Sequence, residues 1–295
     1  MNSPIQEHAV ALMWSLWAEL GVPGTTRDHE RAVVDPEALL VISPLVMKND
    51  ARLRDEVFRW CVAHADRVSS SRLHGLVRRA RPEVRAAFGE LAATLAEAAN
   101  VRWPREPVDA PWPRVPERRP STIQLMRPSL ARLRLRAVAG VGARADVLAE
   151  LLGRADSWTT ASDLDYLGYS KRNVARVLSE LAEAGVASQR ADRNALVFQL
   201  LRAGLWIDVV HVGEVTWPRW DLILGLLVEA LALCDLHTKA AAVRRVEATK
   251  ARGRMSPLAE ALGVPQPPIV RGNTDAWSEL LQWAETQLSA LPHGR

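Results

Sequence analysis

The stretch from Thr159 to Leu200 restricts the possible folds of this chain more than any other part of its sequence. It reads TTASDLDYLGYSKRNVARVLSELAEAGVASQRADRNALVFQL. Apolar residues recur at helical spacing on both sides of Gly168, and a glycine can adopt the positive φ that a sharp turn between helices needs. Beyond Gly185, apolar and polar residues alternate around a polar turn. The stretch therefore predicts two helices, a tight turn and a β-hairpin.

Capping residues indicate where these two helices begin and end. The spacing Thr160-x-x-Asp163 matches a capping box and predicts the start of the first helix. Ser170 is a typical N-cap for the second helix, and Gly185 stands where a left-handed glycine often ends one. The buried face of the second helix is expected to hold apolar residues at helical spacing: Val174, Val177, Leu178, Leu181 and Ala184.

Positively charged side chains cluster at the N-terminal end of the second helix, where positive charge is unfavourable. Lys171, Arg172, Asn173 and Arg176 lie on the outer face of its first turns. A helix N-terminus carries partial positive charge, so acidic residues would be the stabilising choice there. A local conflict of this kind is expected where function requires it, because an anionic partner removes the penalty. A solvated helix face is the alternative interpretation.

The side chains of this cluster have the chemistry to recognise duplex DNA. Arginine binds guanine through bidentate hydrogen bonds, as expected for Arg172 and Arg176, and asparagine binds adenine similarly, as expected for Asn173. Lys171 and the free backbone amides near Ser170 suit phosphate oxygens. Two hairpin residues could reach a neighbouring phosphate or the minor groove, or could belong to an ordinary exposed turn: Arg190 and Arg193.

This part of the chain resembles the winged helix-turn-helix domain of bacterial transcriptional regulators. The resemblance lies in LRLRAVAGVGARADVLAELL, DLDYLGYSKRNVARVLSELAEAGVA and the hairpin, over roughly residues 129 to 200. A narrower resemblance, to an uncharacterised bacterial group, adds the helical segment DPEALLVISPLVMKNDARLRDEVFRWC. The resemblance implies a dimeric repressor that binds paired half-sites. Some winged helices of toxin–antitoxin systems also restrain a toxin encoded beside them.

Helices are also expected on both sides of this domain. Helical spacing predicts helices over Ile5 to Leu20 and Asp50 to Ala65, and Asp35-Pro36-Glu37 is a strong helix start that Pro44 interrupts. Shorter helices are expected at residues 72–79 and from Pro82 onward. The segment from 101 to 128 is rich in proline and arginine, which predicts an extended linker or a basic arm on DNA. Its tryptophans, Trp103 and Trp112, suggest that it packs on a domain.

The central and C-terminal helices are less regular. Ser129 is expected to cap a long helical region with a break at Gly140-Val-Gly142. Residues 205–215 are rich in β-branched residues and predict a strand. A strongly apolar helix is expected through Leu222–Cys234, where a dimer interface is favoured over an intramolecular core. The basic run at 238–254 is either a solvated face or a second DNA contact, and a last helix follows from Thr274 or Asp275.

The sequence thus predicts a mainly α fold in four parts. These are a helical domain (1–100), a Pro/Arg-rich linker or arm (101–128), a winged helix-turn-helix that combines α-helices with a small β-hairpin (129–204), and a helical C-terminal region (205–295). A chain of 295 residues with 48% hydrophobic residues is long enough for about two domains with real cores. The formal net charge of +4 permits a nucleic-acid partner without requiring one.

The remaining patterns favour a cytoplasmic, soluble protein without catalytic chemistry. Cys61 and Cys234 fit a reducing compartment and buried roles, and the N-terminus lacks the pattern of a signal peptide. The most apolar window, residues 222–236, is shorter than the ~20 residues that a membrane span needs. The seven histidines lack metal-ligand spacing, and Asp163-x-Asp165 would point in different directions from a helix. Asp28-His29-Glu30 is interpreted as a loop surface.

We therefore expect a sequence-specific regulator of transcription that binds double-stranded DNA, with no enzymatic activity, metal or cofactor. By the resemblance it is a repressor and a homodimer, with a recognition helix that starts at Ser170. The alternative is an interaction protein, such as an antitoxin-like partner that restrains a neighbouring enzyme through the helical domains. The two functions are compatible, since such a partner can also bind DNA.

Overall fold

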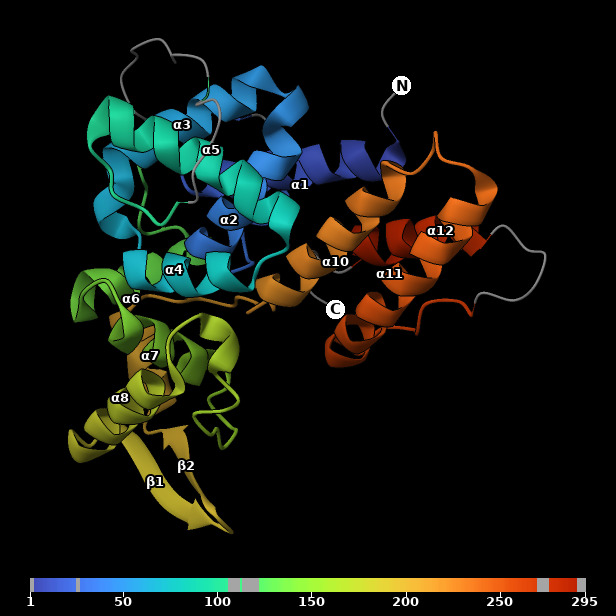
Figure 1. Cartoon of the computed structure of the whole chain (residues 1–295). Coiled ribbons are helices and arrows are strands. Elements are labelled where there is room, and N and C mark those ends of the chain that lie inside the picture. The colour runs from blue at the N-terminus through green and yellow to red at the C-terminus, as the bar shows by residue number, and fades with distance from the viewer. Residues whose placement is uncertain (1–2, 25–26, 106–111, 113–121, 270–275, 291–295) are drawn as a thin grey trace.

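The fold is mainly helical (Figure 1). The structure, a computed structural model, describes residues 3–24, 27–105, 112, 122–269 and 276–290. Within these residues the only sheet is one antiparallel pair, β1 (Ala187–Asp192) and β2 (Ala195–Leu200). The helices are α1 (Pro4–Glu19), α2 (Pro36–Val46), α3 (Ala51–His64), α4 (Ser70–Arg79), α5 (Pro82–Ala99), α6 (Ala131–Ala139), α7 (Ala143–Gly153), α8 (Lys171–Glu183), α9 (Ala203–Val209), α10 (Trp220–Cys234), α11 (Ala241–Leu262) and α12 (Ala276–Ala290).

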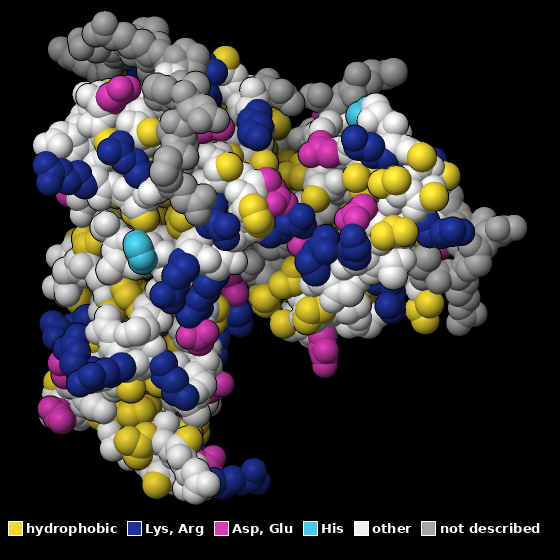
Figure 2. All heavy atoms as spheres, in the orientation of Figure 1, with side chains coloured by type: hydrophobic (Ala, Val, Ile, Leu, Met, Phe, Trp, Pro, Cys, Tyr) yellow, Lys and Arg dark blue, Asp and Glu magenta, His cyan; other side chains and the backbone are white. Residues whose placement is uncertain are grey.

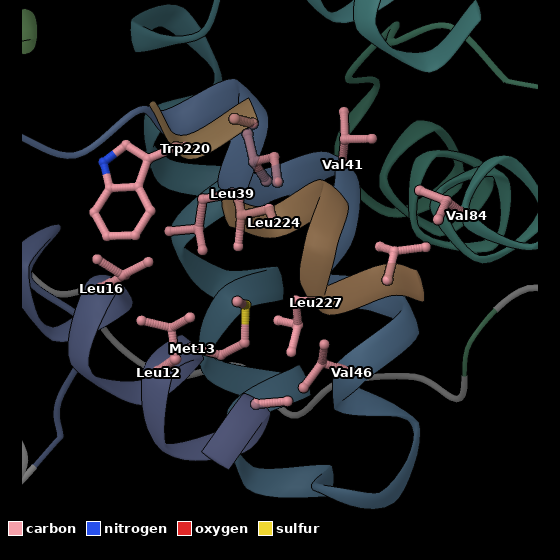
Figure 3. Packing of buried hydrophobic residues seen from close by; sticks show 14 of the residues in the cluster. Leu12, Met13, Leu16, Leu39, Val41, Val46, Val84, Trp220, Leu224 and Leu227 are labelled. Atoms are coloured by element: carbon pink, nitrogen blue, oxygen red, sulfur yellow. The ribbon is translucent and has the colours of Figure 1, made fainter. Parts of the chain in front are cut away.

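The helices are grouped around two hydrophobic clusters. The larger cluster unites the apolar faces of α1–α5 with those of α10–α12, so the two ends of the chain share one core. Figure 3 shows this union, with Leu16 of α1 near Trp220 of α10 and Leu39 of α2 beside Leu224 of α10. The smaller cluster joins α6–α9 with the hairpin. In Figure 1 this second group lies below the first, and the hairpin points away from the rest of the molecule.

Helix α10 is an interior helix of the larger cluster. Its side chains Leu224, Leu226 and Leu227 are fully buried, and α10 packs against α1, α2, α11 and α12. The dimer interface that we favoured for Leu222–Cys234 is therefore wrong, and the intramolecular core is correct. A helix that is apolar nearly all round needs burial on every side, but its sequence does not specify whether the cover comes from its own chain or a partner.

The predicted N-terminal helices are confirmed, with one difference. Asp35 caps α2 by accepting a hydrogen bond from the Ala38 amide at 3.1 Å, and α1 and α3 lie where expected. Pro44, however, does not interrupt α2, which continues to Val46. Proline removes one backbone donor from a helix, and this loss is tolerated here in the last turn, within a well-packed core.

Two further predictions are corrected between residues 129 and 215. Ser129 caps no α-helix: it lies in a short 3-10 turn before α6, and its buried hydroxyl donates to Glu19 Oε2 at 2.6 Å. The predicted strand at 205–215 is also wrong: α9 runs to Val209, and residues 210–215 form turns and bends without a strand. The free edge of β2 is already paired at Phe198 by Thr159, which leaves these β-branched residues no strand to join there. The expected break at Gly140-Val-Gly142 separates α6 from α7.

The tryptophans of the proline-rich segment pack on the helical domain, as predicted. Trp103 is 7% exposed and stacks on Phe88 with ring centroids 6.3 Å apart. The Trp112 amide donates to Thr94 Oγ1 at 2.8 Å. Most of the predicted arm, residues 106–111 and 113–121, lies outside the described residues. None of the described helices combines the length and the apolar character of a membrane span.

Candidate nucleic-acid interface

The segment before α8 is a compact turn rather than the first helix that we predicted. The capping-box bonds do form: the Thr160 amide donates to Asp163 Oδ2 at 2.7 Å, and the Asp163 amide donates to Thr160 Oγ1 at 3.2 Å. Only a 3-10 turn follows, at Asp165–Leu167. So short a segment gains few helical bonds to offset the cost of starting a helix. Arginine side chains of α4 bind its last carbonyl groups instead.

Helix α4 holds this turn through arginine hydrogen bonds and a close contact between two glycines. Arg72 Nε donates to the Leu167 carbonyl at 2.9 Å, and Arg79 Nη1 donates to the Asp165 carbonyl at 2.6 Å. Between them, Gly75 and Gly168 bring the two backbones together: a Cβ on Gly75 would lie 1.7 Å from the Gly168 oxygen. Gly168 has φ +86°, as the sharp turn requires. The start of α8 is thus positioned by the helical domain as well as by its own domain.

Helix α8 begins and ends as predicted. Ser170 Oγ accepts a hydrogen bond from the Asn173 amide at 3.2 Å, and Gly185 follows the helix with φ +69°. Val174, Val177 and Leu178 are fully buried, so the opposite face of the helix points outward. The first turn contains no acidic residue. Because Ser170 caps one amide, the neighbouring amides remain free to bind an anion.

The predicted base-contacting residues of α8 fall into two groups. Lys171 and Arg172 are exposed, and no hydrogen bond or ion pair links their side chains to another described residue. Arg176 instead forms an ion pair with Glu180, and its Nη2 donates to Asn173 Oδ1 at 2.9 Å. Binding by Arg176 or Asn173 would have to break these exposed contacts, which is inexpensive at about 0.3–0.5 kcal/mol for such a helical pair.

Glu180 balances the basic side of this surface. It also binds Arg144 of α7 at 2.9 Å. The hydrogen bond from Arg144, followed by that from Arg176, lowers the pKa of the Glu180 carboxyl, so it remains ionised at neutral pH. Figure 2 shows Lys and Arg side chains gathered over the part of the molecule where α7 and α8 lie.

The hairpin is confirmed, but its two arginines differ. Strands β1 and β2 pair from Ala187–Leu200 to Asp192–Ala195, which leaves Arg193 and Asn194 as the turn. Arg193 is exposed at the tip with φ +52°, a left-handed conformation. Arg190 lies over the ring of Trp158, with its guanidinium 4.1 Å from the ring centroid. Arg190, exposed and partway along β1 opposite Val197, thus covers Trp158, whereas Arg193 projects from the tip.

A buried group of charges joins this domain to the helical domain. We call it the ion cluster and define it as Asp35, Glu37, Arg72, Arg132, Arg136 and Asp146. Arg136 binds Glu37 through two bonds of 2.7 Å and Asp146 Oδ1 at 2.8 Å. Arg72 binds Glu37 at 2.8 Å. All six are at most 8% exposed.

The charges of the ion cluster hold one another ionised. Burial alone would raise the pKa of Asp146, but Arg136, Arg72 and Arg132 outweigh burial and lower that pKa well below its ordinary range. Burial likewise opposes the charge of Arg136, whose pKa is nevertheless raised by Asp146 and Glu37. Buried ion pairs add little net stability, but they specify geometry, because any displacement leaves a charge unpaired.

Sequence reasoning missed the ion cluster. A partial signal exists: Arg132 and Arg136 are four residues apart, on one face of α6. Glu37, which binds Arg136, and Asp35, which binds Arg72, lie about a hundred residues before α6, and helical spacing cannot connect them to it. Tyr169 completes the arrangement by donating to Asp146 Oδ2 at 2.7 Å and bonding Ser69 at 3.0 Å.

His29 and the pair Asp163 and Asp165, which the sequence did not indicate as functional, have structural roles. His29 is not on a loop surface as we interpreted it: it is 5% exposed, and its Nδ1 lies 2.7 Å from Ser15 Oγ. Asp163 bonds Thr160, whereas Asp165 binds Arg79, so this carboxylate pair does not converge. The described residues include no group of three or more His, Cys, Asp or Glu that could hold a metal ion.

Comparison of the chain with protein-family models, with curated proteins and with solved structures found no match.

Proposed function

We propose that this chain is a transcriptional regulator that binds specific double-stranded DNA through a winged helix-turn-helix, with α8 as its recognition helix. The order of elements supports the assignment. Helix α7 is followed by Thr159, which pairs with Phe198 of β2 through amide–carbonyl bonds of 2.8 and 2.9 Å. The turn at 160–168, α8 and the hairpin complete the order. Here the first helix of the helix-turn-helix is reduced to a 3-10 turn.

The observation that carries the proposal is the exposed N-terminus of α8. Lys171 and Arg172 stand beside free backbone amides, with no acidic residue in the first turn and no partner among the described side chains. Their positive charges oppose the helix dipole, and a DNA phosphate or a guanine edge would relieve that conflict. Recognition helices of this class place their N-terminal residues against base edges in the major groove.

Each predicted residue takes a distinct role in this interface. Arg172 binds a base edge, and Lys171 with the amides after Ser170 binds phosphate. Asn173 and Arg176 contribute as a pair, since they are already hydrogen-bonded to each other. Arg193 contacts the backbone beside the groove from the hairpin tip, and Arg190 supports the hairpin through Trp158. The protein acts as a repressor and as a homodimer, so that two copies bind paired half-sites.

A binding titration with matched variants tests this proposal. A duplex selected from a randomised pool is titrated with the wild-type protein, Arg172→Ala and the control Arg245→Ala. Arg245 is an exposed arginine in the basic run of α11, which we take as a solvated face because α11 packs in the larger cluster, apart from α8 (Figure 1). We expect Arg172→Ala to lose about 1–3 kcal/mol of binding free energy and to relax the preference at one base position. Arg245→Ala should retain the affinity and the preference. Equal binding of wild type and Arg172→Ala to the selected duplex and to random duplexes would refute base reading by α8.

A further inference from the structure

Helix α4 presents a second basic surface that the sequence did not single out. Its residues, SSRLHGLVRR, include no acidic side chain. Leu73 and Val77 point into the helical core, whereas His74 and Arg78 are exposed. No hydrogen bond or ion pair connects either of these two side chains to another described residue. Arg78 thus gives the exposed face of α4 a positive charge without a partner among the described residues, and His74 places a hydrogen-bonding ring one turn before it.

This face borders the start of the recognition helix. The chain from 165 to 169 runs antiparallel to α4: Asp165 binds Arg79, Gly168 packs on Gly75, and Tyr169 reaches Ser69. At about 100° per residue, His74 and Arg78 lie on the side of α4 next to Gly75, the residue that contacts the turn, and both face solvent. Figure 2 shows Lys and Arg side chains on one face of the molecule, from the part where α4 lies down to α7 and α8.

The two helices are also held as one unit. Arg72 of α4 belongs to the ion cluster and at the same time donates to the Leu167 carbonyl, two residues before Tyr169. The Gly75–Gly168 approach leaves no room for the turn to slide closer to α4. A ligand that contacts α8 would thus meet α4 in a fixed position, without a cost for ordering it.

We propose that α4 is a second DNA-contacting element, in which His74 and Arg78 bind the phosphate backbone of the duplex whose bases α8 reads. This inference rests on the proposed function and extends it to the helical domain. Phosphate contacts carry no sequence information, so α4 sets the register and orientation of the protein on the duplex. The helical domain then has a direct part in binding, through the helix that also anchors the turn before α8.

Salt dependence distinguishes this contact from a structural role. Full-length wild type, Arg78→Ala, Arg78→Lys and the control Arg245→Ala are titrated with the selected duplex and with a scrambled duplex over a series of salt concentrations. We expect Arg78→Ala to reduce the salt slope by about 1 for both duplexes. At about 0.1 M salt, its affinity should fall about eight-fold for both, since each phosphate contributes a slope of about 0.9.

The other variants decide how the result is interpreted. Arg78→Lys should retain the wild-type slope, because lysine also binds phosphate as a point charge. Arg245→Ala should match wild type. If wild type binds the duplex and Arg78→Ala has the same slope as Arg245→Ala, α4 is not part of the interface and only this inference fails. If wild type binds no duplex, the proposed function fails and takes this inference with it.

Discussion

Replacing Arg136 by methionine would test how the ion cluster holds the two parts of the molecule together. The substitution retains most of the aliphatic chain and removes a guanidinium that is bound to Glu37, to Asp146 and, at 2.9 Å, to the Arg67 carbonyl. Glu37 would keep Arg72, and Asp146 would keep Arg132 and Tyr169, but each carboxylate would lose its closest neutralising partner inside the protein.

The expected loss is large relative to the stability of a folded protein. Removing one partner of a buried ion pair costs about 3–5 kcal/mol of the free energy of unfolding, compared with a typical total of about 5–15 kcal/mol. Urea denaturation followed by tryptophan fluorescence measures it, since the chain has 11 tryptophans. Arg176→Met, which breaks an exposed pair with Glu180, is the control and should cost less than about 1 kcal/mol.

A double-mutant cycle makes the test specific to the pairing. Glu37→Gln combined with Arg136→Met should cost less than the sum of the two single changes, with a coupling of about 0.5–3 kcal/mol. If Arg136→Met costs no more than Arg176→Met, or if the two effects simply add, the ion cluster does not hold the domains as described.

Two further predictions concern pH and a close backbone contact. The lowered pKa of Asp146 means that its stabilisation of the fold should be lost as the pH falls below about 4. The pKa of Tyr169 is raised, first by burial and then by Asp146, so its stabilisation should be lost as the pH rises above about 10. Denaturation at several pH values measures both effects, and a free energy of unfolding that is unchanged across both limits would contradict them. Gly75→Ala should lower the free energy of unfolding by about 1–3 kcal/mol, because its Cβ would collide with the Gly168 backbone. Gly253→Ala, in open space on α11, is the control and should stabilise the protein slightly. Equal effects of the two substitutions in denaturation experiments would refute the contact.

Local rules account for the parts of the fold that the sequence predicted. The caps at Asp35 and Ser170, the glycines at 168 and 185, and the alternation of the hairpin each depend on a few neighbouring residues. Their geometry follows from short-range hydrogen bonding and sterics, which a sequence displays directly. The exposed position of Arg172 follows in turn, since it lies on the side of α8 opposite Val174 and Val177, which must be buried.

The remaining features depend on residues that are distant in the chain. The capping box at Thr160 formed, but contacts from Arg72 and Arg79 replaced the helix expected after it. The apolar residues of α10 predicted that it is buried, but they did not indicate which helices bury it. Nothing in the sequence distinguishes His74 and Arg78 from other surface residues. Only the close contact between Gly75 and Gly168 places them beside the turn that precedes α8. Such pairings are set by tertiary packing, which helical periodicity does not encode.

The most direct test of the central claim is the specificity of wild-type protein for DNA. Duplexes are selected from a randomised pool, and fluorescence anisotropy compares the best sequence with its scrambled version at physiological salt. We predict a recurrent motif and an affinity at least about a thousand-fold higher for the selected duplex, with a steep decrease as salt increases. Selection without a motif, together with equal affinity for both duplexes, would contradict the assignment of α8 as a recognition helix.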